Sequence, residues 1–184
     1  MWNDDVIAQS NPPSQKMGLA NVIPPSGAFL QATKSGEAAL IKTVLEIIGP
    51  SKRVVDLFAG CGTFALPISS KATVHALEGD VNMIAALDSG WRAAGGLHDI
   101  KSETRDLFRR PLMPDEFKKI DAIVIDPPRA GAVSQVVEIA KANVGRIAFV
   151  SCNPATFARD AAILCNNGYN IDWVQVIDQF LWNP

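Results

Sequence analysis

The stretch Val54–Pro67, with the sequence VVDLFAGCGTFALP, constrains the fold of this 184-residue chain more than any other. It begins with an apolar run typical of a buried parallel strand, and one acid, Asp56, lies within that run. Gly60 and Gly62 then form a tight turn, and the apolar residues after it can begin a helix. A strand, a glycine turn and a helix N-terminus together form a cradle of nucleotide size. Because dinucleotide-binding folds use nearly the same device, the turn alone does not identify the ligand.

Length and composition are those of an ordinary globular domain, with 48% apolar and 20% charged residues. No apolar run reaches membrane-spanning length and the N-terminus has no signal-peptide pattern, so we expect a cytoplasmic protein. The net charge of −2 means that a basic surface for nucleic acid must be local or lie on another domain. Three cysteines without a CxxC pair, and two histidines, predict no disulfide framework and no zinc or iron–sulfur site.

Strands and helices are expected to alternate along most of the chain. This alternation predicts an α/β fold with a mostly parallel sheet covered by helices on both faces. Residues 1–28 are rich in proline and glycine and are expected to be extended or loop-like, either a leader or the remnant of a preceding domain. The expected strands cover residues 53–58, 72–77, 100–105, 121–125, 146–150 and about 170–177, and the expected helices cover 35–48, 65–69, 81–94 (capped by Asp80), 133–142 and 154–166.

Several polar residues follow directly after expected strands, at the edge where parallel sheets bind ligands. Glu78 comes eighteen residues after Gly60 and can accept hydrogen bonds from the ribose hydroxyls of NAD or S-adenosylmethionine (SAM) alike. The alternative for Glu78 is an ordinary solvated acid ahead of a helix cap. Asp106, after the third strand, could accept a hydrogen bond from an adenine amino group.

The phrase Asp126-Pro127-Pro128-Arg129 follows the strong fourth strand and argues against a dehydrogenase. Its two prolines fix a rigid, extended turn whose backbone carbonyl groups point outward. Such a turn is suited to grip a planar base beside a cofactor. The alternative is a rigid loop that carries a salt-bridging arginine.

Cys152 lies between a strand and a helix that is expected to begin at Pro154. The N–H groups of a helix N-terminus favour a thiolate, so this position favours a nucleophilic cysteine. Cys165 falls on the apolar face of the same helix and is expected to lie in the core. Cys61, in the glycine turn, is expected only to pack.

Together these motifs resemble those of the RNA uridine-C5 methyltransferases, the family that makes 5-methyluridine in tRNA and ribosomal RNA. The resemblance covers residues 29–184, and the most specific part is Asp126-Pro127-Pro128-Arg129 followed by Ser151-Cys152-Asn153-Pro154. It implies a Rossmann-like class I SAM-dependent methyltransferase fold, SAM as cofactor, and a monomer that uses neither metal nor membrane. It implies Cys152 as the catalytic nucleophile. The implied cofactor-binding residues are Gln31, Phe58, Gly60, Gly62, Thr63, Glu78, Asp106 and Asp126, and the implied substrate-binding residues are Gln31, Asp126, Pro127, Arg129 and Asn153.

The implied reaction explains why a cysteine is needed. Uracil C5 is a poor nucleophile until a thiolate adds to C6 and converts the ring to an enolate. C5 can then take a methyl group, and a base must remove the C5 proton before the thiolate leaves. The RNA must present a single-stranded or flipped-out uridine. The phrase from Phe29 to Thr33 favours ribosomal RNA over tRNA.

Two departures from the family pattern suggest a truncated enzyme. Family members usually begin with an RNA-binding domain, and their general base is a glutamate just after the phrase that matches Phe180–Pro184. Residues 29–184 are therefore expected to form a methyltransferase domain that lacks its last strand. The sequence does not decide whether this domain is active without the missing parts. Two alternatives remain: a SAM enzyme that methylates an exocyclic amine, for which Cys152 is incidental, and a non-catalytic nucleotide-binding fragment.

Overall fold

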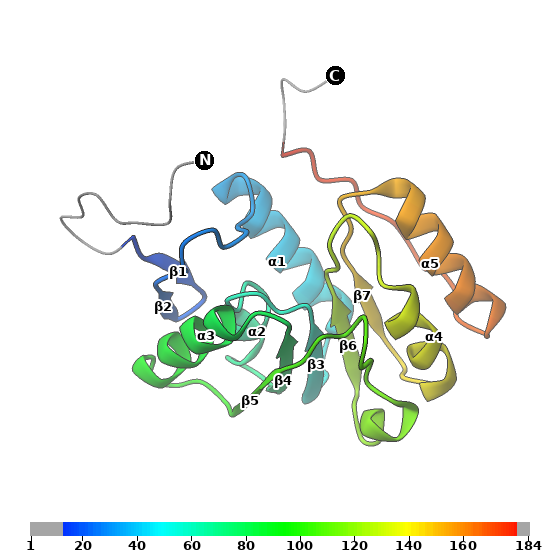
Figure 1. Cartoon of the computed structure of the whole chain (residues 1–184), viewed down its shortest axis with the longest axis horizontal. Coiled ribbons are helices and arrows are strands. Elements are labelled where there is room, and N and C mark those ends of the chain that lie inside the picture. Colours follow the sequence, from blue (N-terminus) through cyan, green and yellow to red (C-terminus); the bar gives the residue numbers. More distant parts are fainter. Residues whose placement is uncertain (1–12, 180–184) are drawn as a thin grey trace.

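The structure, a computed structural model, describes residues 13–179 and contains a five-stranded parallel sheet with helices on both faces (Figure 1). The strand order is β5-β4-β3-β6-β7, so the order reverses between β3 and β6. In such sheets the reversal leaves a crevice at the carboxyl ends of the two central strands. The predicted α/β architecture is confirmed. The strands are β3 (Arg53–Leu57), β4 (Thr73–Glu78), β5 (Ile100–Thr104), β6 (Ala122–Ile125) and β7 (Ile147–Phe149).

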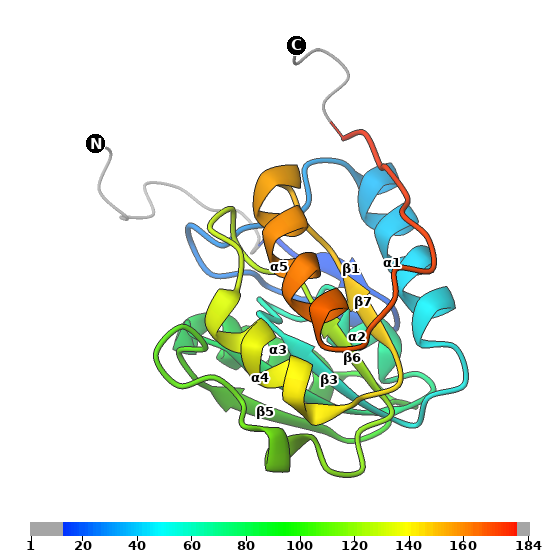
Figure 2. The same ribbon diagram turned by 90° about the vertical axis from the view of Figure 1, so that its right-hand side faces the viewer.

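Successive residues of β3 divide between two cores, one on each face of the sheet. Val54 packs on the face covered by α1, α2 and α3, whereas Val55 and Leu57 pack on the face covered by α4 and α5. Figures 1 and 2 show α4 and α5 side by side on that second face. No helix of the described part has the length and apolar content of a membrane span. The helices are α1 (Lys34–Ile48), α2 (Ala65–Ile68), α3 (Val81–Ala93), the 3₁₀ turn η1 (Pro114–Phe117), α4 (Val133–Ala142) and α5 (Pro154–Asn166).

Two helices begin at side-chain caps that follow a strand closely. Asp80 accepts a hydrogen bond from the N–H of Asn82 at 2.7 Å and so begins α3, as predicted. Asn153 accepts one from the N–H of Ala155 at 3.1 Å and begins α5. Because each cap lies a few residues after its strand, both helix N-termini stay at the carboxyl edge of the sheet.

A β-hairpin of β1 (Gln15–Met17) and β2 (Ala20–Val22) packs against α3 (Figure 1). Met17, Ala20 and Val22 are fully buried, and a Cβ atom at Gly90 of α3 would lie only 2.8 Å from Val22 Cγ2. The hairpin therefore shares the main core, whereas the sequence predicts an extended or loop-like segment over residues 1–28. The first twelve residues of that expectation lie outside the described residues.

The strand expected at about residues 170–177 is not formed, and this prediction is wrong. Residues 169–179 run without regular structure alongside α1, where the Thr43 hydroxyl donates to Gln175 Oε1 at 2.7 Å. Near the end of this segment, Gln179 Nε2 donates to Gln31 Oε1 at 2.9 Å. A strand needs a neighbouring backbone to satisfy its N–H and C=O groups, and within the described residues no ladder partner lies beside this segment.

Candidate active site

The glycine turn connects the carboxyl end of β3 to α2, and its two glycines have different functions. Gly60 has φ 56° and Gly62 has φ 103°, both in the region that favours glycine. A Cβ atom at Gly62 would lie 2.7 Å from Leu66 Cδ1, so this position is filled by packing. A Cβ atom at Gly60 would have only Met83 Sδ near it, at 3.8 Å. The backbone of Gly60 therefore lies open to a ligand.

Gly62→Ala is expected to lower the free energy of unfolding by about 3–5 kcal/mol, because the added methyl group meets Leu66 and the backbone conformation is strained. Gly60→Ala is the matched control, since it carries backbone strain without the clash, and should cost about 1–2 kcal/mol. Denaturant unfolding with unchanged slope measures both losses. Equal losses in the two variants would contradict a packing role for Gly62.

Glu78 ends β4, and its carboxylate connects this strand to the glycine turn. Oε2 accepts from the N–H of Gly60 at 3.0 Å, and Oε1 accepts from the N–H groups of Gly79 at 2.7 Å and Asp80 at 3.0 Å. These bonds fix the carboxylate beside the open face of Gly60, which differs from a freely solvated acid. A carboxylate held there can still accept hydrogen bonds from ribose hydroxyls.

An aromatic pair lies at the same edge of the sheet. Phe58 follows β3 with φ 62°, which is uncommon for an aromatic residue. Its ring centroid is 5.5 Å from that of Phe108, which is exposed. Asp106 accepts from the N–H groups of Phe108 at 3.0 Å and Arg109 at 3.2 Å. The sequence reading missed Phe108, whose only signal is an aromatic residue two positions after Asp106.

Two aspartates lie close together where β3 and β6 end. Asp56 stands in register between Ala76 and Val124, is fully buried, and its carboxyl oxygens have no hydrogen-bond partner among the described residues. Burial raises the pKa of Asp56 well above its usual value, and the nearby charge of Asp126 raises it further. Burial also raises the pKa of Asp126 to about 7. Burial therefore favours the neutral form of Asp56, and Asp126 can exchange a proton near neutral pH.

The two most specific motifs are hydrogen-bonded to each other. Asn153 Nδ2 donates to the carbonyl oxygen of Arg129 at 3.1 Å, and the Thr156 hydroxyl donates to the same oxygen at 3.2 Å. Pro127 is buried, so it anchors the turn, and Arg129 is exposed. Within the described residues the Arg129 guanidinium makes no ion pair, unlike the salt-bridging alternative. The loops after β6 and β7 thus form one unit at the carboxyl edge, a contact that the sequence did not reveal.

Cys152 lies in this unit, one residue before the cap of α5, and is exposed. Its turn is held by the Asn153 N–H, which donates to the Ser151 hydroxyl at 3.2 Å.

Cys61 is buried, and burial raises the pKa of its thiol, which disfavours the thiolate. Cys165 is exposed, so the prediction that it lies in the core is wrong. The inward face of α5 is formed by Ala161 and Leu164, and the next residue is rotated by about 100° toward solvent.

The remaining predicted residues lie at the same edge. Gln31 precedes α1, which runs back along the sheet into β3, so the start of α1 lies at the carboxyl edge. Thr63 follows the glycine turn and is half-buried. The structure therefore brings every predicted site residue to one edge of the sheet, on the loops that follow β3, β4, β5, β6 and β7 or precede α1.

This sheet, its glycine turn and the acid that ends the second strand of the sheet define the Rossmann-like fold of class I SAM-dependent methyltransferases. Residues 23–184 match the family model described as tRNA (Uracil-5-)-methyltransferase, and the chain belongs to that family.

Known relatives support the assignment but are longer than this chain. An uncharacterized RNA methyltransferase of Rhizobium meliloti is 51% identical over 181 residues, which cover 98% of this chain and 44% of that protein. The 23S rRNA (uracil(1939)-C(5))-methyltransferase RlmD of Chromohalobacter salexigens is 37% identical over 157 residues, or 84% of this chain and 32% of that protein. The structure of Pyrococcus abyssi tRNA (uracil-54, C5)-methyltransferase in complex with S-adenosyl-L-homocysteine superposes with TM-score 0.78 at 24% identity, over 91% of this chain and 41% of that one. The chain spans less than half the length of each.

Proposed function

We propose that this chain is the catalytic domain of an enzyme that transfers a methyl group from SAM to C5 of a uridine in RNA, through a covalent bond between Cys152 and C6. The observation that carries the proposal is the hydrogen bond between Asn153 and the Arg129 carbonyl. It holds an exposed thiol beside a rigid proline turn, at the same edge as the glycine cradle. Family membership supports the reaction class. The relative that acts on 23S rRNA, together with the phrase from Phe29 to Thr33, supports ribosomal RNA as the substrate class.

The residues at the sheet edge fit SAM. The open space at Gly60 leaves room for a ligand against the backbone, and the fixed Glu78 carboxylate can accept from its ribose hydroxyls. The Phe58–Phe108 pair offers a ring face to adenine, and Asp106 can accept from the adenine amino group. When bound, SAM supplies a methyl group made electrophilic by a positive sulfur.

The chain's own residues perform the remaining chemistry. The Cys152 thiolate forms a bond to uracil C6, and the electron pair of the C5–C6 double bond moves through C5 to the C4 oxygen. C5 then accepts the methyl group. Loss of the C5 proton to a base restores the double bond and expels the thiolate, which returns Cys152 to its starting state. Burial raises the pKa of Asp126 to about 7, so among the residues that the structure describes this carboxyl group can accept a proton at the edge where the reaction takes place.

Glu78→Ala is expected to weaken SAM binding about ten- to a hundredfold, since hydrogen bonds to a charged group contribute about 1.5–3 kcal/mol. Isothermal titration with SAM measures the loss, and titration with NAD should show no binding to the unsubstituted chain. Glu46→Ala, an exposed glutamate on α1, is the matched control and should bind SAM normally. A folded Glu78→Ala chain with unchanged affinity would remove Glu78 from the site. Binding of NAD in place of SAM would overturn the proposed function.

A further inference from the structure

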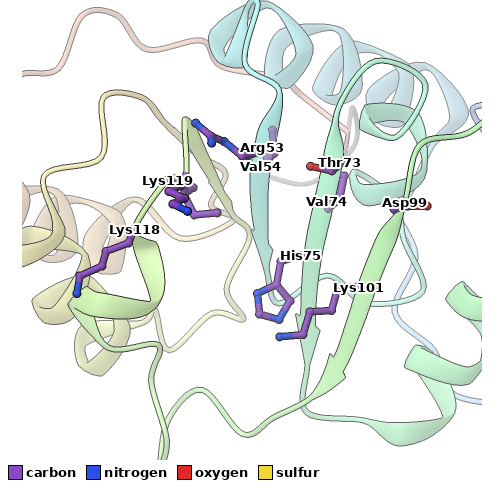
Figure 3. A pocket seen from close by; sticks show the side chains of 10 residues that line it. Arg53, Val54, Thr73, Val74, His75, Asp99, Lys101, Lys118 and Lys119 are labelled. Carbon is purple, nitrogen blue, oxygen red and sulfur yellow. The ribbon is translucent and has the colours of Figure 1, made fainter.

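A shallow groove of about 230 Å³ lies at the amino ends of β3, β4 and β5, away from the candidate active site (Figure 3). One wall of this groove is formed by the strand ends and the other by the turn between η1 and β6. We call this groove the amino-end groove. Its cationic lining residues are Arg53, Lys101, Lys118 and Lys119, with the imidazole of His75 between them and Asp99 as the one acid among the lining residues that the structure describes.

Some of these cations are already paired. Arg53 Nη2 lies 2.8 Å from Asp121 Oδ1. Glu103 Oε2 lies 3.0 Å from His75 Nε2 and 3.9 Å from Lys101 Nζ. Burial lowers the pKa of His75, so this imidazole adds little positive charge at neutral pH.

Lys118 and Lys119 are the unpaired cations of the groove. Both are exposed, and neither ammonium group has a hydrogen bond or an ion pair with any residue in 13–179. Figure 3 shows the Lys118 side chain running from this turn away from the strands, so its ammonium group lies at the rim of the groove. Two unpaired ammonium groups on adjacent residues of one turn attract an anion. A phosphate group fits this chemistry, because lysine binds phosphate as a point charge.

The backbone of Lys119 has a conformation that is uncommon for a lysine. Lys119 has φ 70°, a conformation that glycine or asparagine adopts more readily. The turn is held by the Ile120 N–H, which donates to the Phe117 carbonyl at 3.0 Å, and by the buried Phe117 ring. A lysine at this position costs backbone strain, and its ammonium group is what it adds to the groove.

The topology places cations along a path from the active site to this groove. The connection from β5 to β6 begins at the carboxyl edge and must return to the amino edge, since both strands are parallel. It carries the exposed Arg109 and Arg110 near its start and Lys118 and Lys119 near its end, with Asp115 and Glu116 between them, and Arg109 Nε lies 3.6 Å from Asp106 Oδ2. The five residues of β3 set the distance between the two edges at about 17 Å.

We propose that the amino-end groove binds backbone phosphates of the RNA whose uridine enters the active site. This inference rests on the proposed function. The groove is a local basic surface, and a chain with net charge −2 needs such a surface in order to hold RNA.

The test compares RNA binding by three forms of the chain: unsubstituted, Lys118→Gln with Lys119→Asn, and the control Lys16→Gln with Lys42→Gln. Both double variants remove two exposed lysines and so change the net charge equally. The probe is a fluorescent single-stranded RNA of about 12 nucleotides that contains uridine. Anisotropy titrations over a range of salt give the slope of log K against log salt. Each phosphate contact contributes about 0.7 to that slope, so the Lys118/Lys119 variant should lose about 1.4 and the control nothing.

Two further readouts separate a binding role from a structural one. SAM affinity should be the same in all three forms, and the melting temperature of the Lys118/Lys119 variant should be equal or higher, because asparagine tolerates the turn at 119. An unchanged salt slope in that variant would overturn the groove assignment and leave the proposed function standing. No RNA binding by the unsubstituted chain at low salt would overturn both. If inorganic phosphate raises the melting temperature of the unsubstituted chain and of the control but not of the Lys118/Lys119 variant, while the RNA slopes are equal, the groove takes a small free anion and the inference fails.

Discussion

Cys152→Ala is expected to abolish the covalent complex between this chain and an RNA that carries 5-fluorouridine in the presence of SAM. In this substrate C5 bears fluorine in place of the proton, so no base can complete the reaction after C5 is methylated, and the Cys152–C6 bond persists. A denaturing gel with labelled RNA detects the complex as a slower band. Because Cys152 is exposed in a turn, the substitution should change the free energy of unfolding by no more than about 0.5 kcal/mol and leave SAM affinity intact.

Cys165→Ala provides a matched control, because Cys165 is also exposed and lies at the other end of α5. This variant should form the covalent complex as the unsubstituted chain does. A complex that survives in Cys152→Ala would remove Cys152 from the nucleophile's role. Methyl transfer to RNA by both variants without any covalent complex would favour the amine-methylating alternative.

The sequence predicts which residues share one edge of the sheet, because a parallel sheet collects the ends of its strands there. Glu78 ends an expected strand, and Asp106, Asp126 and Cys152 each come just after one, so their meeting at that edge follows from strand order and direction alone. The side-chain contacts that complete the site do not follow in this way. The bond from Asn153 to the Arg129 carbonyl joins loops twenty-four positions apart, and nothing in either phrase specifies it.

At both ends of the described residues, tertiary context decides what the sequence alone does not show. β1 and β2 are three residues long, too short for an alternating pattern to stand out among prolines, and they are stable because Met17 and Val22 enter a core built by other elements. Residues 170–177 have the composition of a strand, with Ile171 and Val176 exposed. Composition sets the tendency, but pairing requires a neighbour, and the described residues provide none there.

Asp126→Asn is expected to raise the free energy of unfolding by about 2–4 kcal/mol at about pH 8, and to leave it unchanged at about pH 4. Burial raises the pKa of Asp126 from 3.8 to about 7. Between these values the folded chain holds a proton that the unfolded chain has released. The stability that this group contributes is therefore present below the unfolded pKa and is lost as the pH rises to about 7. Asparagine cannot ionise, so the variant avoids that loss, which denaturant unfolding at several pH values measures.

Asp121→Asn is the control at the opposite end of β6, and its effect should have the opposite sign. The Arg53 guanidinium and two backbone N–H groups lower the pKa of Asp121. Its contribution to stability is present above the unfolded pKa and is lost as the pH falls through the folded pKa. The Asp121 variant should therefore be less stable than the unsubstituted chain at neutral pH, whereas the Asp126 variant should be more stable.

Ligand binding gives Asp126 a second test, because SAM carries a positive sulfur and S-adenosylhomocysteine carries a neutral one. An ionised Asp126 at the cofactor edge attracts the positive sulfur, so the preference for SAM over S-adenosylhomocysteine should grow as the pH passes about 7. In Asp126→Asn this preference should not change with pH. A variant that is less stable than the unsubstituted chain at about pH 8 would show that Asp126 is ionised and well paired in the folded state. In that case a proton-exchanging role for Asp126 at neutral pH would be wrong.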